Sequence, residues 1–368
     1  MTASVVFVQS RTHRGGAQTC LARIIAHQKL RRWNPVLVTS PGGWLANEAR
    51  RHGAIVVEEP FRSSRSLRAL LFGNAMLVRR ISTRLAKLAI EPIIVQANDH
   101  TEGLLGIEIA RRVGARSAII LRSSMMSRRD FLKYRCNEYD FISAVGEDFR
   151  ARVQFWSPDR KIALIHDGIA EEEFAQPKAK PDMLPRRILV IGSPQDLKGW
   201  GDLADALFRL QEDGALPPLQ FDFTGKPSEN SPSALKLARV NGLNCVFLDR
   251  VDEFRDLVLQ YDLVINPSRM ETFGMAAVEV LAAGVPLISS RTGVIEQIIE
   301  EPAMLFPPGE PDDLAAALRR LFADWSKLDF GVARSQENIR KRFLIDRTVD
   351  KLTHVYEELS DVTPSSRT

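Results

Sequence analysis

Short runs of β-branched residues alternate with longer amphipathic stretches through most of the 368-residue chain. This alternation is typical of β–α units arranged around a parallel sheet. A Pro- and Lys-rich stretch at residues 177–185 interrupts it once and reads as a linker, after which the alternation restarts. We therefore expect two doubly wound α/β domains in series. The predicted strands are Val5–Val8, Val36–Val38, Ile55–Val57, Ile93–Gln96, Ala118–Leu121, Phe141–Ala144, Ile162–Ile165, Ile188–Ile191, Phe221–Phe223, Cys245–Leu248, Leu263–Ile265, Leu287–Ser289 and Met304–Phe306.

The predicted first domain covers residues 1–177 and the second covers residues 186–345. Residues 346–368 are predicted to form a C-terminal helix that crosses back to the first domain, followed by a frayed polar tail. Sheets of this kind bind ligands at the carboxyl ends of their strands, so the expected site is the cleft between the domains.

The composition excludes several protein classes. The three cysteines, Cys20, Cys136 and Cys245, have no metal-ligand or disulfide-framework spacing. No apolar run approaches the roughly 20 residues that a membrane span needs, and no signal peptide is readable at the N-terminus. We therefore expect a soluble, cytoplasmic protein.

The segment Asn266–Pro286 carries the most chemical information. A loop opens with Pro267-Ser268 after a buried strand, and a helix is predicted to start near Phe273-Gly274 and to stop at Gly284. The N-terminus of such a helix presents unpaired N–H groups and a partial positive charge, which suit a diphosphate. Glu271 before the helix and Glu279 within it supply carboxylates for sugar hydroxyls, although each alone is more often a solvated surface residue.

Taken together, P-S-x-x-E-x-F-G-x-x-x-x-E followed by A-x-G-x-P resembles the E-x7-E motif of the retaining nucleotide-sugar glycosyltransferases with the GT-B fold (glycosyl transferases group 1). Further segments are similar to the motifs of that family, in family order: Arg14–Ala17, Lys161–Phe174, Ile188–Gly199 and Gly293–Glu296. The resemblance implies two facing Rossmann-like domains, an acceptor domain and a nucleotide-sugar donor domain.

The resemblance also implies roles for single residues. Glu271 would bind the donor sugar, Glu279 the ribose and Lys198 the diphosphate. Gly16 would allow the first-domain loop to approach the donor, and Val246–Arg250 would flank the base. The remaining donor-binding positions are Ser193, Arg250, Thr272, Phe273, Gly274 and Met275.

The chain departs from the family pattern at three places. Ser193 replaces the arginine that usually accompanies the lysine, so that Arg250 or Arg269 would have to supply the missing cation. Gln96-Ala97-Asn98 stands where the family has H-x-H, and Leu121-Arg122-Ser123 stands where it has T-x-H. His100 is then the acceptor-side catalytic candidate, although a lone loop histidine is more often a bystander.

The chain contains no D-x-D, so a bridging divalent metal has no evident protein ligand and no cofactor or metal is expected. Retention belongs to the resemblance, which implies that the leaving phosphate helps to deprotonate the acceptor. Spacing alone shows no carboxylate pair of the kind that a retaining glycosidase uses.

Charge is distributed unevenly along the chain. Residues 1–180 hold 29 basic and 17 acidic residues, a balance of +12, and the remainder balances at −8. The segment 61–88 places arginines, Arg62, Arg65 and Arg68 among them, beside apolar residues at helical spacing. Such a segment fits an anionic membrane surface as well as it fits an ordinary core-facing helix with solvated arginines. Nucleic acid is not expected, because aromatic residues are few and no known RNA- or DNA-binding motif appears.

The sequence thus predicts a retaining, metal-independent glycosyltransferase that is cytoplasmic and peripheral to the membrane. It would pass a sugar from a nucleotide diphosphate to a glycan or lipid-linked acceptor in cell-surface polysaccharide or glycolipid biosynthesis. The alternatives are a non-catalytic binding protein of the same fold, which Ser193 and the missing histidines favour, and a nucleotide-sugar epimerase or a phosphorylase.

Overall fold

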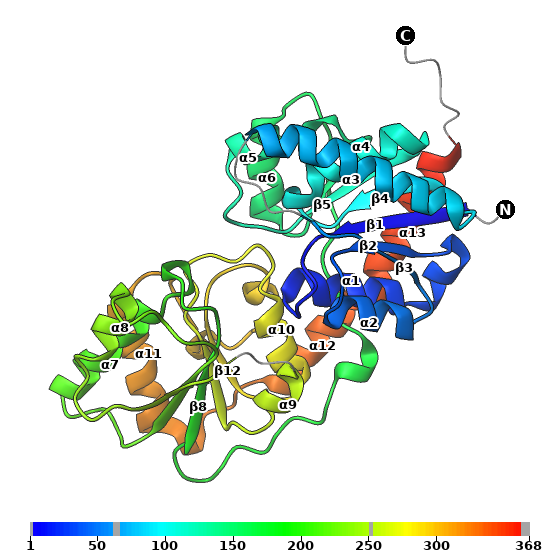
Figure 1. The fold of residues 1–368 in the computed structure, drawn as a ribbon. Helices are drawn as coiled ribbons and strands as arrows, with labels where there is room; N and C mark the ends of the chain where they lie inside the picture. The colour runs from blue at the N-terminus through cyan, green and yellow to red at the C-terminus, as the bar shows by residue number, and fades with distance from the viewer. Residues whose placement is uncertain (1–2, 62–66, 250–252, 362–368) are drawn as a thin grey trace. The chain divides into compact units, whose positions relative to one another are not determined.

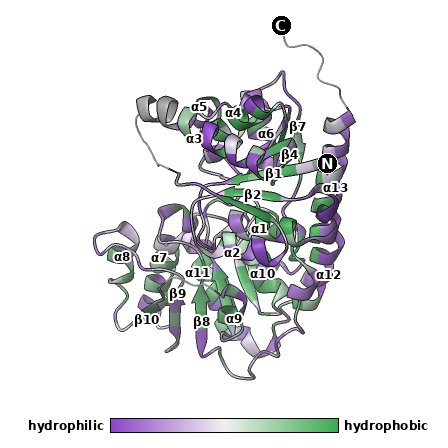
Figure 2. Cartoon of the chain, turned by 45° about the vertical axis from the view of Figure 1, so that its right-hand side comes forward, coloured by the Kyte–Doolittle hydropathy of each residue, from purple (hydrophilic) through white to green (hydrophobic). Residues whose placement is uncertain are grey.

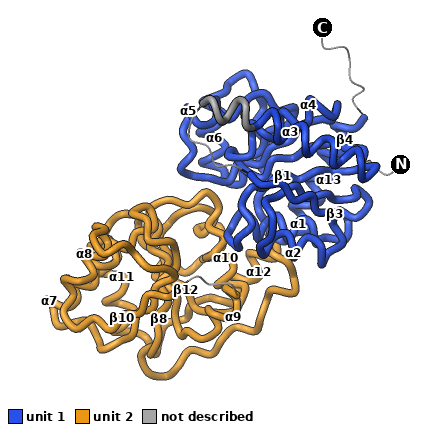
Figure 3. The backbone as a smooth tube through the Cα atoms, in the orientation of Figure 1, with its two compact units in different colours: residues 1–168, 344–368 blue, residues 169–343 orange. Residues whose placement is uncertain are grey.

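A computed structural model describes residues 3–61, 67–249 and 253–361. The chain divides into two compact units: unit 1 comprises residues 1–168 and 344–368, and unit 2 comprises residues 169–343 (Figure 3). Every strand predicted from the sequence coincides with a strand of the structure to within two residues at each end.

The described residues of unit 1 form a seven-stranded parallel sheet in the order β3-β2-β1-β4-β5-β6-β7. Helices α3 and α4 pack together on one face, and α1, α2 and α13 lie on the other (Figure 1). The strands are β1 Ala3–Gln9, β2 Val36–Thr39, β3 Ile55–Glu58, β4 Glu91–Ala97, β5 Arg116–Leu121, β6 Phe141–Ala144 and β7 Ile162–Leu164. The helices are α1 Gly16–Ala26, α2 Trp44–Arg51, α3 Leu67–Lys87, α4 Gly103–Val113, α5 Arg128–Lys133, α6 Glu147–Trp156 and α13 Ile345–Asp361.

The described residues of unit 2 form a six-stranded parallel sheet in the order β10-β9-β8-β11-β12-β13, with α7, α8 and α11 on one face and α9, α10 and α12 on the other (Figure 1). Its strands are β8 Arg187–Val190, β9 Gln220–Phe223, β10 Asn244–Phe247, β11 Leu263–Asn266, β12 Leu287–Ser290 and β13 Leu305–Phe306. Its helices are α7 Trp200–Glu212, α8 Pro232–Leu237, α9 Phe254–Val258, α10 Met275–Ala282, α11 Pro311–Asp324 and α12 Val332–Phe343.

Helices cover both faces of the two sheets, and the inner strands are buried along most of their length, as in β2, β8 and β11 (Figure 2). The edge of the second sheet differs, because β9 alternates polar and apolar residues and β10 is partly exposed. Residues 174–186, which precede β8, form neither helix nor strand, but hydrogen bonds hold them against the rest of unit 2. The backbone N–H groups of Ala175 and Lys178 donate to the carbonyls of Ala282 and Gly284, and Lys180 Nζ donates to the carbonyl of Trp325.

Helix α3 covers the core of unit 1 with its apolar side chains. Leu77, Val78, Ile81 and Leu85 are buried in one cluster with the valines of β1 and β2. Over residues 77–85 the apolar face of the helix thus packs on the core, and the arginines Arg79, Arg80 and Arg84 are exposed. Arg62 and Arg65 lie outside the described residues, as does the side chain of Arg68 and the tail at 362–368.

Candidate functional site

In each unit the strand order reverses at one place, between β1 and β4 in unit 1 and between β8 and β11 in unit 2. Parallel sheets bind ligands beyond the carboxyl ends of the strands at such a reversal, because the loops there diverge to opposite faces. The predicted residues Gly16 and His100 follow β1 and β4, and Ser193, Lys198 and Glu271 follow β8 and β11.

The pair Lys198 and Glu271 is the centre of the candidate donor site in unit 2. Lys198 Nζ lies 2.6 Å from Glu271 Oε1, and their side chains are 26% and 18% exposed. The two residues come from different loops, 73 positions apart in the chain. The structure therefore brings together a cation and a carboxylate that the sequence analysis assigned to the two halves of one donor.

Two contacts join the loops that carry this pair. Gly199, with φ +69°, packs so closely on the next loop that an added Cβ would lie 1.8 Å from the carbonyl oxygen of Pro267. Arg269 donates its backbone N–H to the carbonyl of Leu197. Its guanidinium binds both carboxylate oxygens of Asp202, at 2.7 and 2.5 Å, and Asp202 is buried. Arg269, suggested above as a substitute phosphate cation, thus links the loop after β11 to the loop after β8 and to the start of α7.

Helix α10 begins directly beside Glu271. Gly274 precedes it with φ +92°, a backbone conformation that glycine adopts at little cost, and the helix extends over Met275–Ala282 as the sequence predicted. The carbonyl of Phe273 accepts the backbone N–H of Val294 at 2.9 Å. Phe273 and Met275 are buried, whereas Thr272 and Glu279 are half-buried. Glu279 lies on the second turn of α10, eight residues after Glu271.

The remaining donor candidates are placed less tightly around this pair. Ser193 is half-buried in the loop after β8. Val246, the next-to-last residue of strand β10, is 43% exposed. Arg250 lies outside the described residues.

In unit 1, Asn98 and Glu102 connect the loops after β1 and β4. Asn98 Nδ2 donates to the carbonyl of Ala17 at 3.0 Å, and Glu102 Oε1 accepts the backbone N–H of Ser10 at 3.2 Å. Gly16 starts helix α1, and an added Cβ there would meet no atom within 4 Å. The chain itself thus leaves the space beside Gly16 open.

His100 is held by the carboxylate of Asp99. Asp99 Oδ1 lies 3.2 Å from His100 Nδ1 and accepts the backbone N–H groups of His100 and Arg122. Burial disfavours the charged imidazole, but the hydrogen bond and charge of Asp99, with Glu102 and Asp130, outweigh it and raise the pKa of His100. Burial likewise opposes the charge of Asp99, and His100 more than compensates, so the pKa of Asp99 is lowered.

The sequence analysis missed a buried network around Arg122, which it treated only as a departure from a motif. Arg122 Nη2 donates to Asp167 Oδ1 at 2.9 Å, and Nη1 donates to the backbone carbonyl and the side chain of Asn98 at 2.7 and 2.6 Å. Both charged side chains are 5% exposed. One feature of the sequence could have indicated this network. Arg122 and Asp167 each follow a predicted strand closely, at the carboxyl edge of the sheet where ligands bind.

Within residues 3–61, 67–249 and 253–361, no cluster of three or more His, Cys, Asp or Glu side chains is arranged to hold a metal ion. In the same ranges, no helix combines the length and the apolarity that crossing a membrane requires.

Residues 185–324, most of unit 2, match the family described as "Glycosyl transferases group 1". The match contains Lys198, Glu271 and Glu279, the residues on which the resemblance rests. This part of the chain thus carries the pattern of that family, and the resemblance stated from the sequence is confirmed over it.

Matches to curated relatives extend into unit 1. An uncharacterized glycosyltransferase of Methanocaldococcus jannaschii is 27% identical over 252 residues, which cover 66% of each chain. A D-inositol 3-phosphate glycosyltransferase of Streptomyces bingchenggensis is 29% identical over 59% of this chain and 52% of its own length. The chain thus spans less than two thirds of the length of either relative.

The chain has the GT-B fold, as the resemblance implied. The HepE protein of Anabaena, solved in complex with UDP and glucose, superimposes with a TM-score of 0.77 at 17% identity. That likeness covers 98% of this chain and 100% of the HepE chain.

Proposed function

We propose that the chain transfers a sugar from a nucleotide-diphosphate donor to a glycan or lipid-linked acceptor, with retention and without a metal. The observation that carries the proposal is the Lys198–Glu271 pair at the strand-order reversal of unit 2, beside the N-terminus of α10. A donor of this kind has hydroxyls at one end and a diphosphate at the other, and the pair offers one partner to each.

Negative charge develops on the diphosphate as its bond to the sugar breaks. The Lys198 ammonium and the first backbone N–H groups of α10 stabilise that charge without rearranging, which lowers the barrier. Glu271 accepts hydrogen bonds from the sugar hydroxyls and so fixes the anomeric carbon relative to Lys198. A phosphate oxygen of the leaving group takes the proton of the attacking acceptor hydroxyl on the same face, and this path retains the configuration.

Further support for the donor comes from HepE, which was solved with UDP-glucose. Glu279 binds the ribose in this proposal, Gly16 leaves room for the donor phosphates, and His100 contacts the acceptor. The product belongs to a cell-surface polysaccharide or glycolipid, made by a cytoplasmic enzyme at the membrane face.

A thermal-shift measurement with UDP-, GDP-, ADP- and TDP-sugars in the absence of metal tests the donor site. A donor at 100 times its Kd adds about 2.7 kcal/mol to the free energy of unfolding. We expect one nucleotide to stabilise the protein, and Glu279→Ala to lose that stabilisation. The control Glu337→Ala removes an exposed glutamate of α12 and should keep it. Stabilisation by none of the donors, or an equal shift in Glu279→Ala, would refute the proposed donor site.

Ser193 favours a second candidate, a binding protein of this fold that has lost turnover. It stands where the family has a phosphate-binding arginine, and Arg269, one of the two suggested substitutes, is paired with Asp202. Donor binding without hydrolysis or transfer over prolonged incubation, in the presence of a range of glycan acceptors, would favour this candidate.

A further inference from the structure

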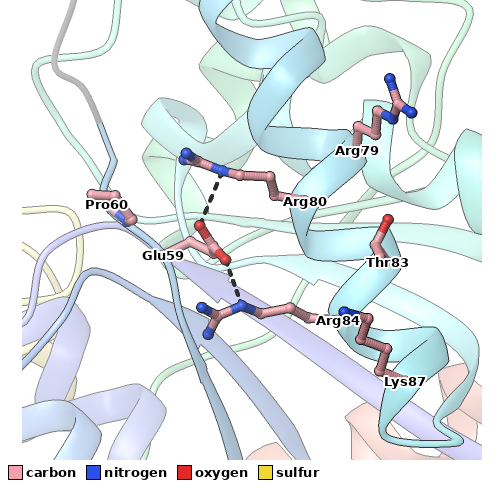
Figure 4. Close-up of a pocket in the computed structure, with 7 residues that line it drawn as sticks. All are labelled: Glu59, Pro60, Arg79, Arg80, Thr83, Arg84 and Lys87. Atoms are coloured by element: carbon pink, nitrogen blue, oxygen red, sulfur yellow. Dashed lines mark ion pairs between the residues drawn. The ribbon is translucent and has the colours of Figure 1, made fainter.

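A pocket of about 630 Å³ lies in unit 1 between the end of β3 and helix α3 (Figure 4). This volume is in the range of small-molecule sites. The polar residues that line it are Glu59, Arg79, Arg80, Thr83, Arg84 and Lys87.

Glu59 forms ion pairs with two of the arginines, Arg80 and Arg84. Its carboxylate is 4% exposed and binds Arg80 Nε at 3.1 Å and Arg84 Nε at 2.7 Å, one oxygen to each (Figure 4). Both guanidinium groups remain about half exposed, at 50% and 56%. Because each arginine uses its Nε atom for Glu59, the outer nitrogen atoms of Arg80 point away from the carboxylate.

The cations of the pocket exceed what Glu59 neutralises. Four cations surround one carboxylate, which leaves an excess of three positive charges. Within the described residues, neither Arg79 nor Lys87 has a carboxylate partner. The helix dipole accounts for cations in the last turn of α3, which includes Arg84 and Lys87, but not for Arg79 and Arg80 about two turns earlier. Like charges three and four residues apart on a helix repel one another, so the fold alone does not call for this arrangement.

We propose that this pocket binds the phosphate group of a phosphate ester. Arg79, Arg80 and Lys87 contact the phosphate oxygens in this proposal, the Thr83 hydroxyl donates a further hydrogen bond, and Glu59 orients Arg80 and Arg84. A guanidinium fork matches the oxygens of a phosphate or a carboxylate. The charge selects the phosphate, since a monoester carries about −1.5 to −2 at neutral pH whereas a carboxylate carries only −1.

The position of the pocket beside the sheet indicates which ligand carries the phosphate. Glu59 directly follows β3, the edge strand, and β3 lies two strands from β1, whose loop carries Gly16. Neighbouring strands are about 4.8 Å apart, so the lateral separation is about 10 Å. One ligand can therefore place its phosphate in the pocket and its reacting end near the loops after β1 and β4. For the identity of that ligand the inference rests on the proposed function: it is a phosphate-bearing acceptor.

Two probes distinguish a soluble ester from a lipid headgroup. Glycerol 3-phosphate is titrated calorimetrically into the full-length protein, and vesicles of phosphatidylcholine with or without phosphatidic acid, a lipid phosphate monoester, are tested by co-sedimentation. The pocket variant is Arg79→Gln with Lys87→Gln, which leaves the Glu59 pairs in place. The control is Arg112→Gln with Arg129→Gln, two exposed cations of the same unit with the same loss of charge.

We expect the pocket variant to weaken binding of glycerol 3-phosphate, of vesicles with phosphatidic acid, or of both, at least tenfold, and the control to stay within twofold of the wild type. The probe that binds identifies the source of the phosphate. Equal losses in both variants, or binding of neither probe to the wild type, would overturn the pocket. The donor thermal shift, measured on the same samples, separates the two proposals: a shift without phosphate binding contradicts the pocket alone, and phosphate binding without a shift contradicts the donor site alone.

Discussion

At the scale of single residues, the ion pair between Lys198 and Glu271 separates activity from stability. Both side chains are partly exposed, and such a pair contributes only about 0–1 kcal/mol to folding. Its role in transfer is larger in the proposed mechanism, in which Glu271 contacts the sugar in the transition state. Glu271→Gln should therefore reduce kcat/KM about 100-fold or more while changing Tm by only a few degrees. Initial rates of sugar transfer and thermal unfolding check the two halves of this prediction.

The matched control is Asp262→Asn. Asp262 forms a similarly exposed ion pair with Lys178, but it precedes β11 and so lies at the opposite end of that strand from Glu271. It should keep transfer within about twofold. If both variants lose the same activity, Glu271 acts only through the fold of unit 2.

His100 and Asp99 make the stability of unit 1 depend on pH. The pKa of His100 is raised, so its contribution is complete below the ordinary pKa of about 6.5 and is lost as the pH rises through the folded-state value. The pKa of Asp99 is lowered, so its contribution is lost as the pH falls below about 3.8. The difference in free energy of unfolding between wild type and His100→Asn should thus be largest near pH 5 to 6 and shrink toward alkaline pH. Urea titrations across this range measure it.

His354→Asn provides the comparison for that experiment, since His354 is an exposed histidine of the same unit on α13. Its difference from the wild type should stay small and nearly constant with pH. A pH-independent difference for His100→Asn would show that Asp99 does not hold the charged imidazole.

At the scale of elements, the proposed donor site depends on the contact between the loops after β8 and β11. Gly199→Ala places a Cβ 1.8 Å from the carbonyl oxygen of Pro267 and imposes φ +69° on alanine, so both clash and strain oppose it. Gly214→Ala imposes nearly the same φ, +64°, with no atom within 4 Å. Strain alone costs about 1–2 kcal/mol. Gly199→Ala should lose about 2 kcal/mol more than that and should also lose transfer, because Lys198 is the preceding residue.

Urea unfolding and transfer rates of the two glycine variants check this prediction. Gly214→Ala should remain active, since Gly214 ends α7 away from the carboxyl edge of the sheet. Equal losses of stability in the two variants would mean that the loop yields to the added methyl group and that the contact with Pro267 does not position Lys198.

The sequence predicts the elements better than the contacts between them. The inner strands, such as β1, β8 and β11, were predictable because a sheet covered on both faces needs a continuous apolar run, which is visible in one window of sequence. The start of α10 was predictable from Gly274. The brace between Asp202 and Arg269 was not, because it joins residues 67 positions apart whose side chains meet only once β8 and β11 are paired. The role of Arg122 was hidden for the same reason, and the proposed roles of Lys198, Glu271 and Glu279 remain predictions.

At the scale of the whole molecule, unit 1 is discontinuous in sequence. Its last helix, α13, follows all of unit 2 and packs on α1 and β4. Tyr356 on α13 donates its hydroxyl to Gln96 Oε1 on β4 at 2.6 Å in a fully buried contact, and burial raises the pKa of Tyr356, so that it stays neutral. Unit 1 is therefore complete only after the end of the chain has returned to its sheet.

Tyr356→Phe should destabilise unit 1 by about 1–3 kcal/mol, because it leaves the buried oxygen of Gln96 without its donor. Tyr261→Phe is the counterpart in unit 2, where Tyr261 donates to Asp222 at 2.7 Å. Native-state hydrogen exchange resolves the effects, since separate parts of a protein open with their own free energies. Tyr356→Phe should lower protection in β1 and β4 and leave the donor-induced thermal shift unchanged, whereas Tyr261→Phe should lower protection in β8 and β9. An equal loss of protection in both units for either variant would mean that the two units open as one, and the separation of donor binding from the stability of unit 1 would then be wrong.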